Sequence, residues 1–365
     1  MIRKIRRAIA ALFVLLSGAA QAGPFTGLTI LGDSLADTGN VLSLTTAFSP
    51  PPFPSYPGAE GRFSNGPGWT EYLAAGLDLP TAAAPSNLLF AGAQGVIPIG
   101  PPGGQNFAFG GARTGLGGNA GPTTGLIGQL IAWNGTVFAG SLTRVADPNA
   151  LYVLMAGAND LRDARSANPG AGTADDSART AAAVTTATNI TNVAGLLAQA
   201  GARHFLVSNM PDLGKTPEAA ALGNVAASSD VTVKFNAALA TTMLGLDSLF
   251  LTLFGIDLDI RFMDLFGLNE VVYTDAVQNG GAMFGITNVT TPCIAPVAPG
   301  AYFFPGSTDI NCGVSLYSDP LHPTAVAHRM IGQLALATAV PEPGSLMLLL
   351  LAVGILAAAT RQKRA

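Results

Sequence analysis

The chain is poor in charge, histidine and cysteine, and this limits the chemistry open to it. Of its 365 residues, 11% are charged, three are histidine and two are cysteine. No C-x-x-C pair occurs, so the usual spacing of zinc and dithiol redox sites is absent. Cys293 and Cys312 can pair if the chain is exported to an oxidising compartment. Their bond would close a loop of about 20 residues and stabilise the fold by roughly 3 kcal/mol in the chain-entropy model.

Basic charge is scarce in the middle of the chain. Seven of the 18 Lys and Arg residues lie in short clusters at the two ends. Residues 23–339 hold 11 basic and 21 acidic residues, a net charge of about −10. Surfaces that bind nucleic acid carry clustered positive charge, so we expect no nucleic-acid partner.

Residues 1–22 have the order of a secretory signal peptide. A basic stretch at residues 3–7 precedes an apolar run at residues 8–16, and Ala20-Gln21-Ala22 follows as an A-x-A cleavage site. The alternative is a membrane anchor, but the apolar run is shorter than the roughly 20 residues that span a bilayer. We therefore expect export, with cleavage near Ala22.

Residues 340–365 form a second segment that differs from the rest of the chain. Pro341-Glu342-Pro343 precedes an apolar run of 14 residues, 346–359, and a basic cluster at residues 361–364. The alternative is a permanent tail anchor, for which the run is short. The segment resembles a PEP-CTERM sorting tail. That resemblance implies transient anchoring in the inner membrane, processing by an exosortase, and delivery to the surface of a Gram-negative bacterium.

Apolar segments of strand length alternate with helical segments between the two ends. Strands are expected near residues 27–31, 107–109, 151–156, 204–209 and 261–265, and helices near 69–77, 125–138, 177–199, 231–246 and 323–337. This alternation predicts a parallel sheet covered by helices on both faces. No linker divides residues 23–339, so we expect one domain there. The G-x-G-x-x-A match at residues 115–120 lacks a preceding strand, and we interpret it as a loop.

Ser34 stands directly after the first expected strand, in Gly32-Asp33-Ser34-Leu35. Ligands of parallel α/β sheets bind at the carboxyl ends of strands, so a nucleophile would be well placed there. A serine at that position is also a common helix N-cap, and the position taken alone favours the cap. No G-x-S-x-G motif occurs, which excludes the usual nucleophile elbow of the α/β-hydrolases.

A serine nucleophile needs a base, and His322 is the best placed of the three histidines. His204 precedes an apolar strand and His328 lies within the last helix. His322 lies in a loop that two prolines stiffen, and Asp319 precedes it by three residues, near enough to orient the imidazole. In the alternative interpretation, Asp319 is a turn residue and His322 only begins the helix.

Ester hydrolysis also needs hydrogen-bond donors for the oxyanion. Asn159 follows the clearest strand and offers a side-chain amide, and the Gly110–Gly111 pair permits a close approach of backbone N–H groups. Alternatively, Asn159 is a turn or cap residue and the glycines form only a turn.

Together these pieces resemble the SGNH, or GDSL, hydrolase family in order and spacing, over about residues 26–337. The four blocks are matched by the stretches that contain Ser34, Gly111, Asn159 and the pair Asp319 and His322. Further stretches at residues 61–66, 106–113, 209–213 and 322–329 are similar to the lipase-like branch.

The resemblance implies a flavodoxin-like three-layer α/β/α sandwich with a central parallel sheet. It implies Ser34 as nucleophile, His322 as base and Asp319 as its partner. The oxyanion donors would be the backbone N–H groups of Ser34 and Gly111 and the Asn159 side chain; the offset from the asparagine before it favours Gly111 over its neighbour. No metal or cofactor is implied.

The resulting expectation is a secreted carboxylic ester hydrolase that acts on lipid or simple acyl esters through an acyl-enzyme. Loops near residues 41–68, 80–104 and 270–315 are expected to shape the acyl pocket. Two other enzymatic alternatives are an O-acetyl esterase of exopolysaccharide and an acyltransferase. An alternative of a different class is a non-catalytic surface or matrix protein that uses a hydrolase scaffold.

Overall fold

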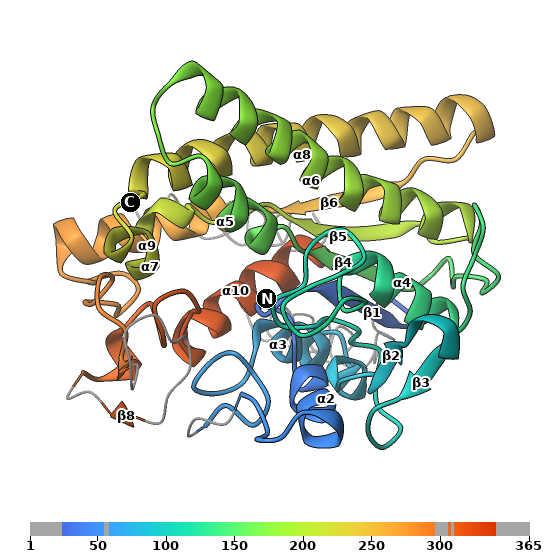
Figure 1. Ribbon diagram of the computed structural model, residues 1–365, viewed down its shortest axis with the longest axis horizontal. Helices are drawn as coiled ribbons and strands as arrows, with labels where there is room; N and C mark the ends of the chain where they lie inside the picture. The colour runs from blue at the N-terminus through green and yellow to red at the C-terminus, as the bar shows by residue number, and fades with distance from the viewer. Residues whose placement is uncertain (1–23, 55–57, 296–305, 308–309, 341–365) are drawn as a thin grey trace, which may run out of the picture.

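The computed structural model describes residues 24–54, 58–295, 306–307 and 310–340. The expected signal peptide and most of the sorting tail lie outside these residues. A parallel sheet of four strands forms the centre, in the order β1 (Leu28–Gly32), β4 (Leu151–Met155), β5 (His204–Ser208), β6 (Asp259–Met263). Figure 1 shows these strands side by side with helices above and below them.

The segment at residues 105–109 runs along the free edge of β1 without forming a regular strand, which differs from the expected strand at 107–109. Ile30 donates to the Gln105 carbonyl, while the N–H groups of Phe107 and Phe109 donate to the carbonyls of Ile30 and Gly32. The segment therefore extends the parallel pairing by a fifth position and brings the Gly110–Gly111 turn to the carboxyl end of β1.

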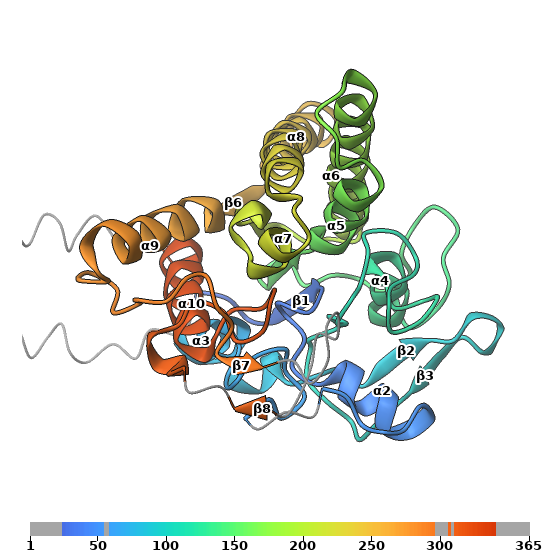
Figure 2. The ribbon, with the colours of Figure 1, turned by 60° about the vertical axis from the view of Figure 1, so that its left-hand side comes forward.

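The helices cover both faces of the sheet, as the alternation of apolar segments predicted. Their bounds are α2 (Asn40–Phe48), α3 (Trp69–Gly76), α4 (Leu126–Asn134), α5 (Ala158–Ala167), α6 (Thr173–Gln199), α7 (Pro217–Ala221), α8 (Val225–Phe254), α9 (Leu265–Asn279) and α10 (Ala325–Ala339). Short 3-10 helices lie at Pro80–Ala83, Gly92–Gln94, Leu213–Lys215 and Cys312–Val314. Figure 2 shows α6 and α8 on one side of the sheet and α3 and α10 on the other.

Each central strand is buried on both faces, because alternate side chains point in opposite directions. In β4, Tyr152 and Leu154 pack with α4, α5, α6 and α8, whereas Leu151 and Val153 pack with α3 and α10. Burial of each large apolar side chain contributes roughly 1.5–3 kcal/mol. The chain is thus an α/β protein with three layers, as expected.

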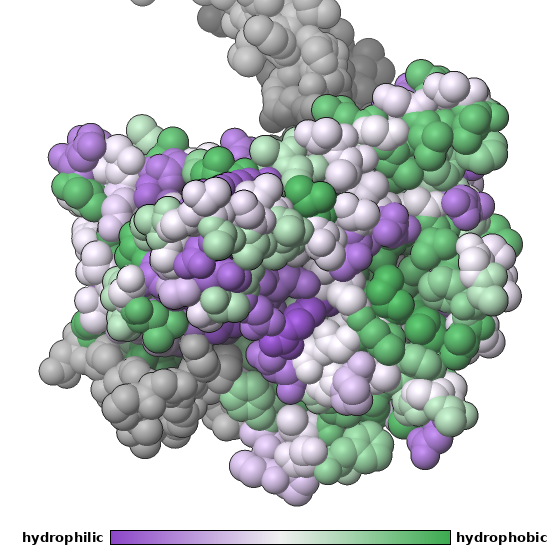
Figure 3. All heavy atoms as spheres, turned by 45° about the horizontal axis from the view of Figure 1, so that its top comes forward, coloured by the Kyte–Doolittle hydropathy of each residue, from purple (hydrophilic) through white to green (hydrophobic). Residues whose placement is uncertain are grey.

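The longest helix, α8, was expected to be shorter, over residues 231–246. By length and composition it is the one described helix that would suffice to cross a membrane. Here it packs along α6 and buries Phe235, Leu239 and Met243. Its C-terminal half exposes several leucines, including Leu249 and Leu251. Hydrophobic residues gather on this side of the molecule, at the right of Figure 3.

The connecting regions contain more structure than expected. Residues 41–68 include most of α2, and residues 270–279 belong to α9, a helix that was not expected. Residues 80–104 contain the antiparallel pair β2 (Leu88–Phe90) and β3 (Val96–Pro98). They do not line the described cavities beside Ser34, but Leu89 and Ile99 pack behind the lining residues Val41 and Phe63. A second pair, β7 (Ile294–Ala295) and β8 (Gly306–Ser307), lies near the last loop.

Candidate active site

Ser34 lies in the turn that follows β1. The strand ends at Gly32, where a Cβ atom would stand 2.5 Å from the Met155 carbonyl oxygen, so only glycine lets β1 and β4 end this close together. The Asp33 carboxylate accepts the N–H of Leu35 at 3.1 Å and tightens the turn. Helix α2 begins later, with Gly39 as its N-cap, so Ser34 is not a helix cap.

His322 is held by the loop before α10. Both the N–H and the hydroxyl of Ser318 donate to its carbonyl oxygen. The Asp319 carboxylate accepts the backbone N–H of His322 at 2.7 Å. Thr324 caps α10 by accepting the N–H of Ala327. His322 therefore belongs to the loop, and the helix has another residue at its start.

The three residues meet although Ser34 and His322 are 288 positions apart. The Nε2 atom of His322 lies 2.8 Å from Ser34 Oγ, and its Nδ1 atom lies 2.7 Å from Asp319 Oδ2. All three side chains are buried, with residue exposures of 8%, 3% and 4% for Ser34, His322 and Asp319. A base that contacts both a hydroxyl and an orienting carboxylate is the arrangement that activates a serine.

The Gly110–Gly111 turn lies beside Ser34. The N–H of Gly110 donates to Asp37 Oδ2 at 2.8 Å. Within the described part of the chain, the N–H groups of Ser34 and Gly111 have no protein acceptor. Gly111 has a φ of 75°, and a Cβ at Gly110 would stand 1.9 Å from the ring of Phe63. Both positions therefore need glycine, and Gly111 rather than Gly110 has its N–H available.

Asn159 lies in the first turn of α5, after Gly157, whose φ of 117° turns the chain into the helix. Its Nδ2 atom donates to the Ala112 carbonyl at 2.9 Å, and its Oδ1 atom accepts from Arg162 at 3.0 Å. Asn159, Gly111 and Ser34 all line one cavity. The residues expected to form an oxyanion hole are thus brought together.

The other two histidines lie outside this arrangement. His204 pairs with Asp259 at the opposite ends of the strands, where their side chains are 2.8 Å apart. His328 is buried and accepts the N–H of Trp69 through Nδ1, and burial lowers its pKa to about 3. It is therefore neutral at ordinary pH and serves as a core acceptor.

Two buried carboxyl groups lie close to Ser34. Burial raises the pKa of Asp33 and of Asp37 to about 6, against the hydrogen bonds that favour their charged forms. Asp37 accepts the N–H groups of Gly39, Asn40 and Gly110, so it ties the start of α2 to the glycine turn. Within the described residues, no group of His, Cys, Asp and Glu side chains could hold a metal ion.

Two cavities meet at Ser34 and His322. The first is narrow, about 60 Å³, and is lined mostly by apolar side chains of α9, α10 and the loops beside them. The second is wider, about 470 Å³, and is lined by α2, the glycine turn, Asn159 and Arg162. The site therefore offers an apolar slot on one side of the serine and a wider, more polar space on the other.

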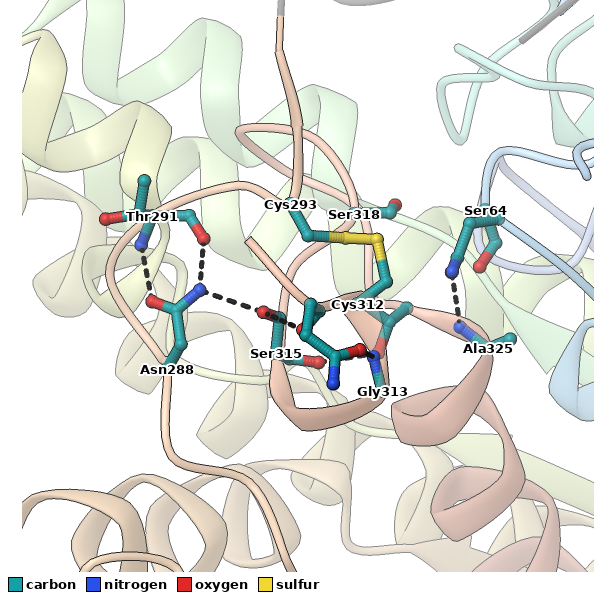
Figure 4. The surroundings of a disulfide bond; sticks show 12 residues. Ser64, Asn288, Thr291, Cys293, Cys312, Gly313, Ser315, Ser318 and Ala325 are labelled. Atoms are coloured by element: carbon teal, nitrogen blue, oxygen red, sulfur yellow. Dashed lines mark hydrogen bonds between the residues drawn. A yellow bond between two sulfur atoms is a disulfide. The ribbon is translucent and has the colours of Figure 1, made fainter. Parts of the chain in front are cut away.

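The disulfide expected between Cys293 and Cys312 is present, with Cα atoms 5.2 Å apart (Figure 4). The N–H of Cys293 donates to the Tyr317 carbonyl, and that of Ile294 donates to the Ser318 carbonyl. The disulfide thus lies beside the chain that leads into Asp319.

Sequence reasoning missed two residues at the site. Phe63 packs its ring 5.3 Å from the ring of His322. Arg162 lines the wider cavity and donates to Asn159. Its spacing of three residues from Asn159 on a helix is the one signal in the sequence that placed the two on the same face.

The chain is similar to known proteins over most of its length. The family model described as GDSL-like Lipase/Acylhydrolase matches residues 28–335, and that of the PEP-CTERM protein-sorting motif matches residues 339–364. The phosphatidylcholine-sterol acyltransferase of Aeromonas hydrophila is 26% identical over 359 residues, with 86% of this chain and 90% of that protein covered.

Two more distant similarities are found. An uncharacterized protein in the trpE-trpG intergenic region of Pseudomonas putida is 26% identical over 352 residues, which span 87% of this chain and 49% of that protein. A solved structure of a lipolytic G-D-S-L family protein from Veillonella parvula has a TM-score of 0.38 and 13% identity, over 86% of this chain and 98% of the other.

Proposed function

Because the chain belongs to the family of GDSL-like lipases and acylhydrolases, we propose that it hydrolyses carboxylic esters with Ser34 as nucleophile. The observation that carries this proposal is the continuous contact from Asp319 through His322 to Ser34, at 2.7 and 2.8 Å. In this role His322 is the general base, and Asp319 orients it and stabilises its charged form.

The reaction follows from this geometry. As Ser34 Oγ attacks the ester carbonyl, His322 Nε2 takes its proton, and negative charge develops on the carbonyl oxygen. The N–H groups of Ser34 and Gly111 and the Asn159 amide act as oxyanion donors, each worth roughly 3 kcal/mol in the transition state. His322 then protonates the leaving alcohol. A water molecule, deprotonated by His322, attacks the acyl-enzyme and releases the acid.

The two cavities favour lipid or simple acyl esters as substrates. The apolar lining of the narrow slot suits an acyl chain, because burial there removes apolar surface from water. The alcohol part fits the wider cavity, which presents polar groups beside the serine. An enzyme limited to acetyl groups, such as an O-acetyl esterase, would have little use for the slot.

Acyl transfer to an alcohol is a second candidate function. The wider cavity leaves room for an acceptor beside Ser34 and His322. The Aeromonas hydrophila relative is also named an acyltransferase. The two outcomes separate when an alcohol is added to the assay, since transfer yields a new ester whereas hydrolysis yields only free acid.

The chain carries a PEP-CTERM sorting motif, which indicates export and membrane-associated sorting in Gram-negative bacteria. In our proposal residues 1–22 direct export, residues 23–339 form the hydrolase, and an exosortase-type enzyme removes the tail. The enzyme would then act at the cell surface or outside the cell. Export also supplies the oxidising compartment that the Cys293–Cys312 bond requires.

The test is the variant Ser34→Ala in a panel of p-nitrophenyl esters. We expect it to lose turnover and fluorophosphonate labelling while its melting temperature stays close to that of the unsubstituted protein. Ser43→Ala is the matched control, because Ser43 bonds Asn87 and lines none of the cavities that contain Ser34. Turnover that persists in Ser34→Ala would refute the proposal, and an unlabelled parent protein would favour a non-catalytic scaffold.

A further inference from the structure

Arg162 lies one helical turn after Asn159 on α5 and contacts it directly. Its guanidinium donates to Asn159 Oδ1 at 3.0 Å. The Asn159 Nδ2 atom donates to the Ala112 carbonyl, next to Gly111. Both ends of the Asn159 amide are therefore engaged by the protein, and Arg162 is exposed over only 16% of its side chain.

These contacts determine which way the Asn159 amide faces. If the amide turned over, its oxygen would face the Ala112 carbonyl and its NH₂ group would face a guanidinium, and both pairs would repel. With Oδ1 bound to Arg162 and one N–H bound to Ala112, the second N–H remains for the cavity that Asn159 lines with Ser34. An oxyanion donor acts best when it is held in place before the reaction.

Glu218, in the short helix α7, holds Arg162. It accepts two hydrogen bonds from the Arg162 guanidinium, one of them from Nε at 2.9 Å, and is itself only 4% exposed. Such a two-point pair fixes the plane of the guanidinium. The backbone N–H of Glu218 donates to the Pro320 carbonyl at 2.9 Å, inside the loop between Asp319 and His322. Helices α5 and α7 lie side by side (Figures 1 and 2).

We propose that Arg162 is a positioning residue that orients Asn159 as an oxyanion donor. Glu218 fixes the position of Arg162 relative to the loop that carries His322. The inference rests on the proposed ester hydrolysis at Ser34. It assigns Arg162 no contact with the reacting atoms, since it acts through the Asn159 amide.

Arg165 provides a matched control within the same cluster. It also pairs with Glu218, and its guanidinium donates to Ser228 on α8. A purely structural ion cluster would make the two arginines equivalent for catalysis. Positioning makes them different: Arg162→Met lowers kcat, whereas Arg165→Met lowers the melting temperature and leaves kcat of the folded protein within about twofold.

The experiment measures kcat and KM for p-nitrophenyl butyrate in Arg162→Met, Asn159→Ala, the double variant and Arg165→Met, with melting temperatures for all. Removal of one oxyanion donor costs about 10²- to 10³-fold in kcat. We expect Asn159→Ala to show a loss of this size and Arg162→Met a loss of about 10- to 100-fold, each with little change in KM. The double variant should be no slower than Asn159→Ala, because both changes remove the same donor.

The proposal is overturned if the losses of the two single variants multiply in the double variant, if kcat of Arg162→Met is unchanged, or if Arg165→Met lowers kcat equally. Should Arg162→Met fail to fold, Arg162→Lys supplies the same comparison, because lysine keeps the positive charge beside Glu218 but lacks the planar guanidinium that joins Glu218 to Asn159. A parent protein without Ser34-dependent turnover would instead refute the proposed function, so the two failures are distinguishable.

Discussion

Asp319 contacts His322 through both of its carboxylate oxygens. Oδ1 accepts the backbone N–H and Oδ2 lies beside Nδ1, each at 2.7 Å. The first contact shapes the loop and the second selects the tautomer that carries its proton on Nδ1. That tautomer places the lone pair of the ring on Nε2, which lies 2.8 Å from Ser34 Oγ, as the proposed general base requires.

The variant Asp319→Asn separates these two tasks. The amide oxygen can still accept the backbone N–H, so the loop should remain folded. The amide NH₂ then faces Nδ1 and favours the wrong tautomer, and we expect kcat to fall by about 10²- to 10⁴-fold with a small change in KM. Steady-state kinetics with p-nitrophenyl butyrate measure this.

The pair His204 and Asp259 is the control for that variant. It has the same two side chains at a similar distance, 2.8 Å, but lies at the opposite ends of the strands. Asp259→Asn should leave kcat unchanged. An equal loss in both variants would mean that Asp319→Asn acts through general destabilisation and not through the base.

The residues that the structure brings together at Ser34 were named from the sequence, and so was the contact between Asp319 and His322, but the other contacts of the candidate site were not. Ser34, Asn159 and His322 each stand at a strand end or in a proline-stiffened loop, and such positions can be read from apolar spacing. The ion pair of Arg162 with Glu218 joins residues 56 positions apart and has no local pattern. The resemblance to a family, and not periodicity, indicated that Ser34 and His322 meet.

The errors in the predicted fold also have physical causes. Helix α9 was missed because Gly267 and Asn269 interrupt its apolar spacing, although Asp264 caps its start. Residues 107–109 pair with β1 over only a few bonds before the Gly110–Gly111 turn ends the extended chain. Short segments of this kind depend on tertiary contacts, which local preference does not report.

His328 makes the stability of the protein sensitive to acid. Burial lowers its pKa from 6.5 to about 3, so below pH 6.5 the unfolded chain binds a proton that the folded chain does not. Its contribution therefore falls as pH drops from 6.5 towards 3. From pH 7 to pH 5, the unsubstituted protein should therefore lose about 2 kcal/mol more of its unfolding free energy than His328→Gln loses. Denaturant titration at the two pH values measures this difference.

Asp33 should show the opposite dependence. Burial raises its pKa from 3.8 to about 6, so the folded chain binds the proton first, and its contribution to stability rises as pH falls from 6 towards 4. From pH 7 to pH 5, the unsubstituted protein should therefore gain about 1 kcal/mol of unfolding free energy that Asp33→Asn does not gain. If the unfolding free energy of His328→Gln and that of Asp33→Asn changed equally with pH, the pKa shifts assigned to His328 and Asp33 would be wrong.

The Cys293–Cys312 disulfide is expected to support the base loop. The N–H groups of Cys293 and Ile294 donate to the carbonyls of Tyr317 and Ser318. Loss of the disulfide should therefore increase the mobility of the chain just before Asp319. The double variant Cys293→Ser and Cys312→Ser should lose roughly 3 kcal/mol of stability.

The same change should lower kcat severalfold at temperatures where the protein is still folded. Reduction of the unsubstituted protein by dithiothreitol serves as the control and should give the same two effects. Free thiols in the exported protein, found by mass spectrometry, would show that the bond has no role in the cell.

The apolar slot makes a prediction about chain length that depends on one face of α9. Leu265, Leu268 and Val272 line the slot, at a spacing that places them on one stripe of the helix. Helix α9 begins directly after β6, and Val272 lies two turns farther along it than Leu265. A larger side chain at Val272 would fill part of the slot.

We expect Val272→Phe to lower kcat/KM for p-nitrophenyl decanoate by about 15- to 60-fold, the cost of excluding two or three methylene groups at roughly 0.8 kcal/mol each, and to leave the butyrate unchanged. Val271→Phe is the matched control, because Val271 is 51% exposed on another face of α9. If both chain lengths respond equally to Val272→Phe, or if only acetyl esters are turned over by the unsubstituted protein, the slot does not hold the acyl chain. The acyl group would then lie in the wider cavity, and an acetyl-specific activity would become the better assignment.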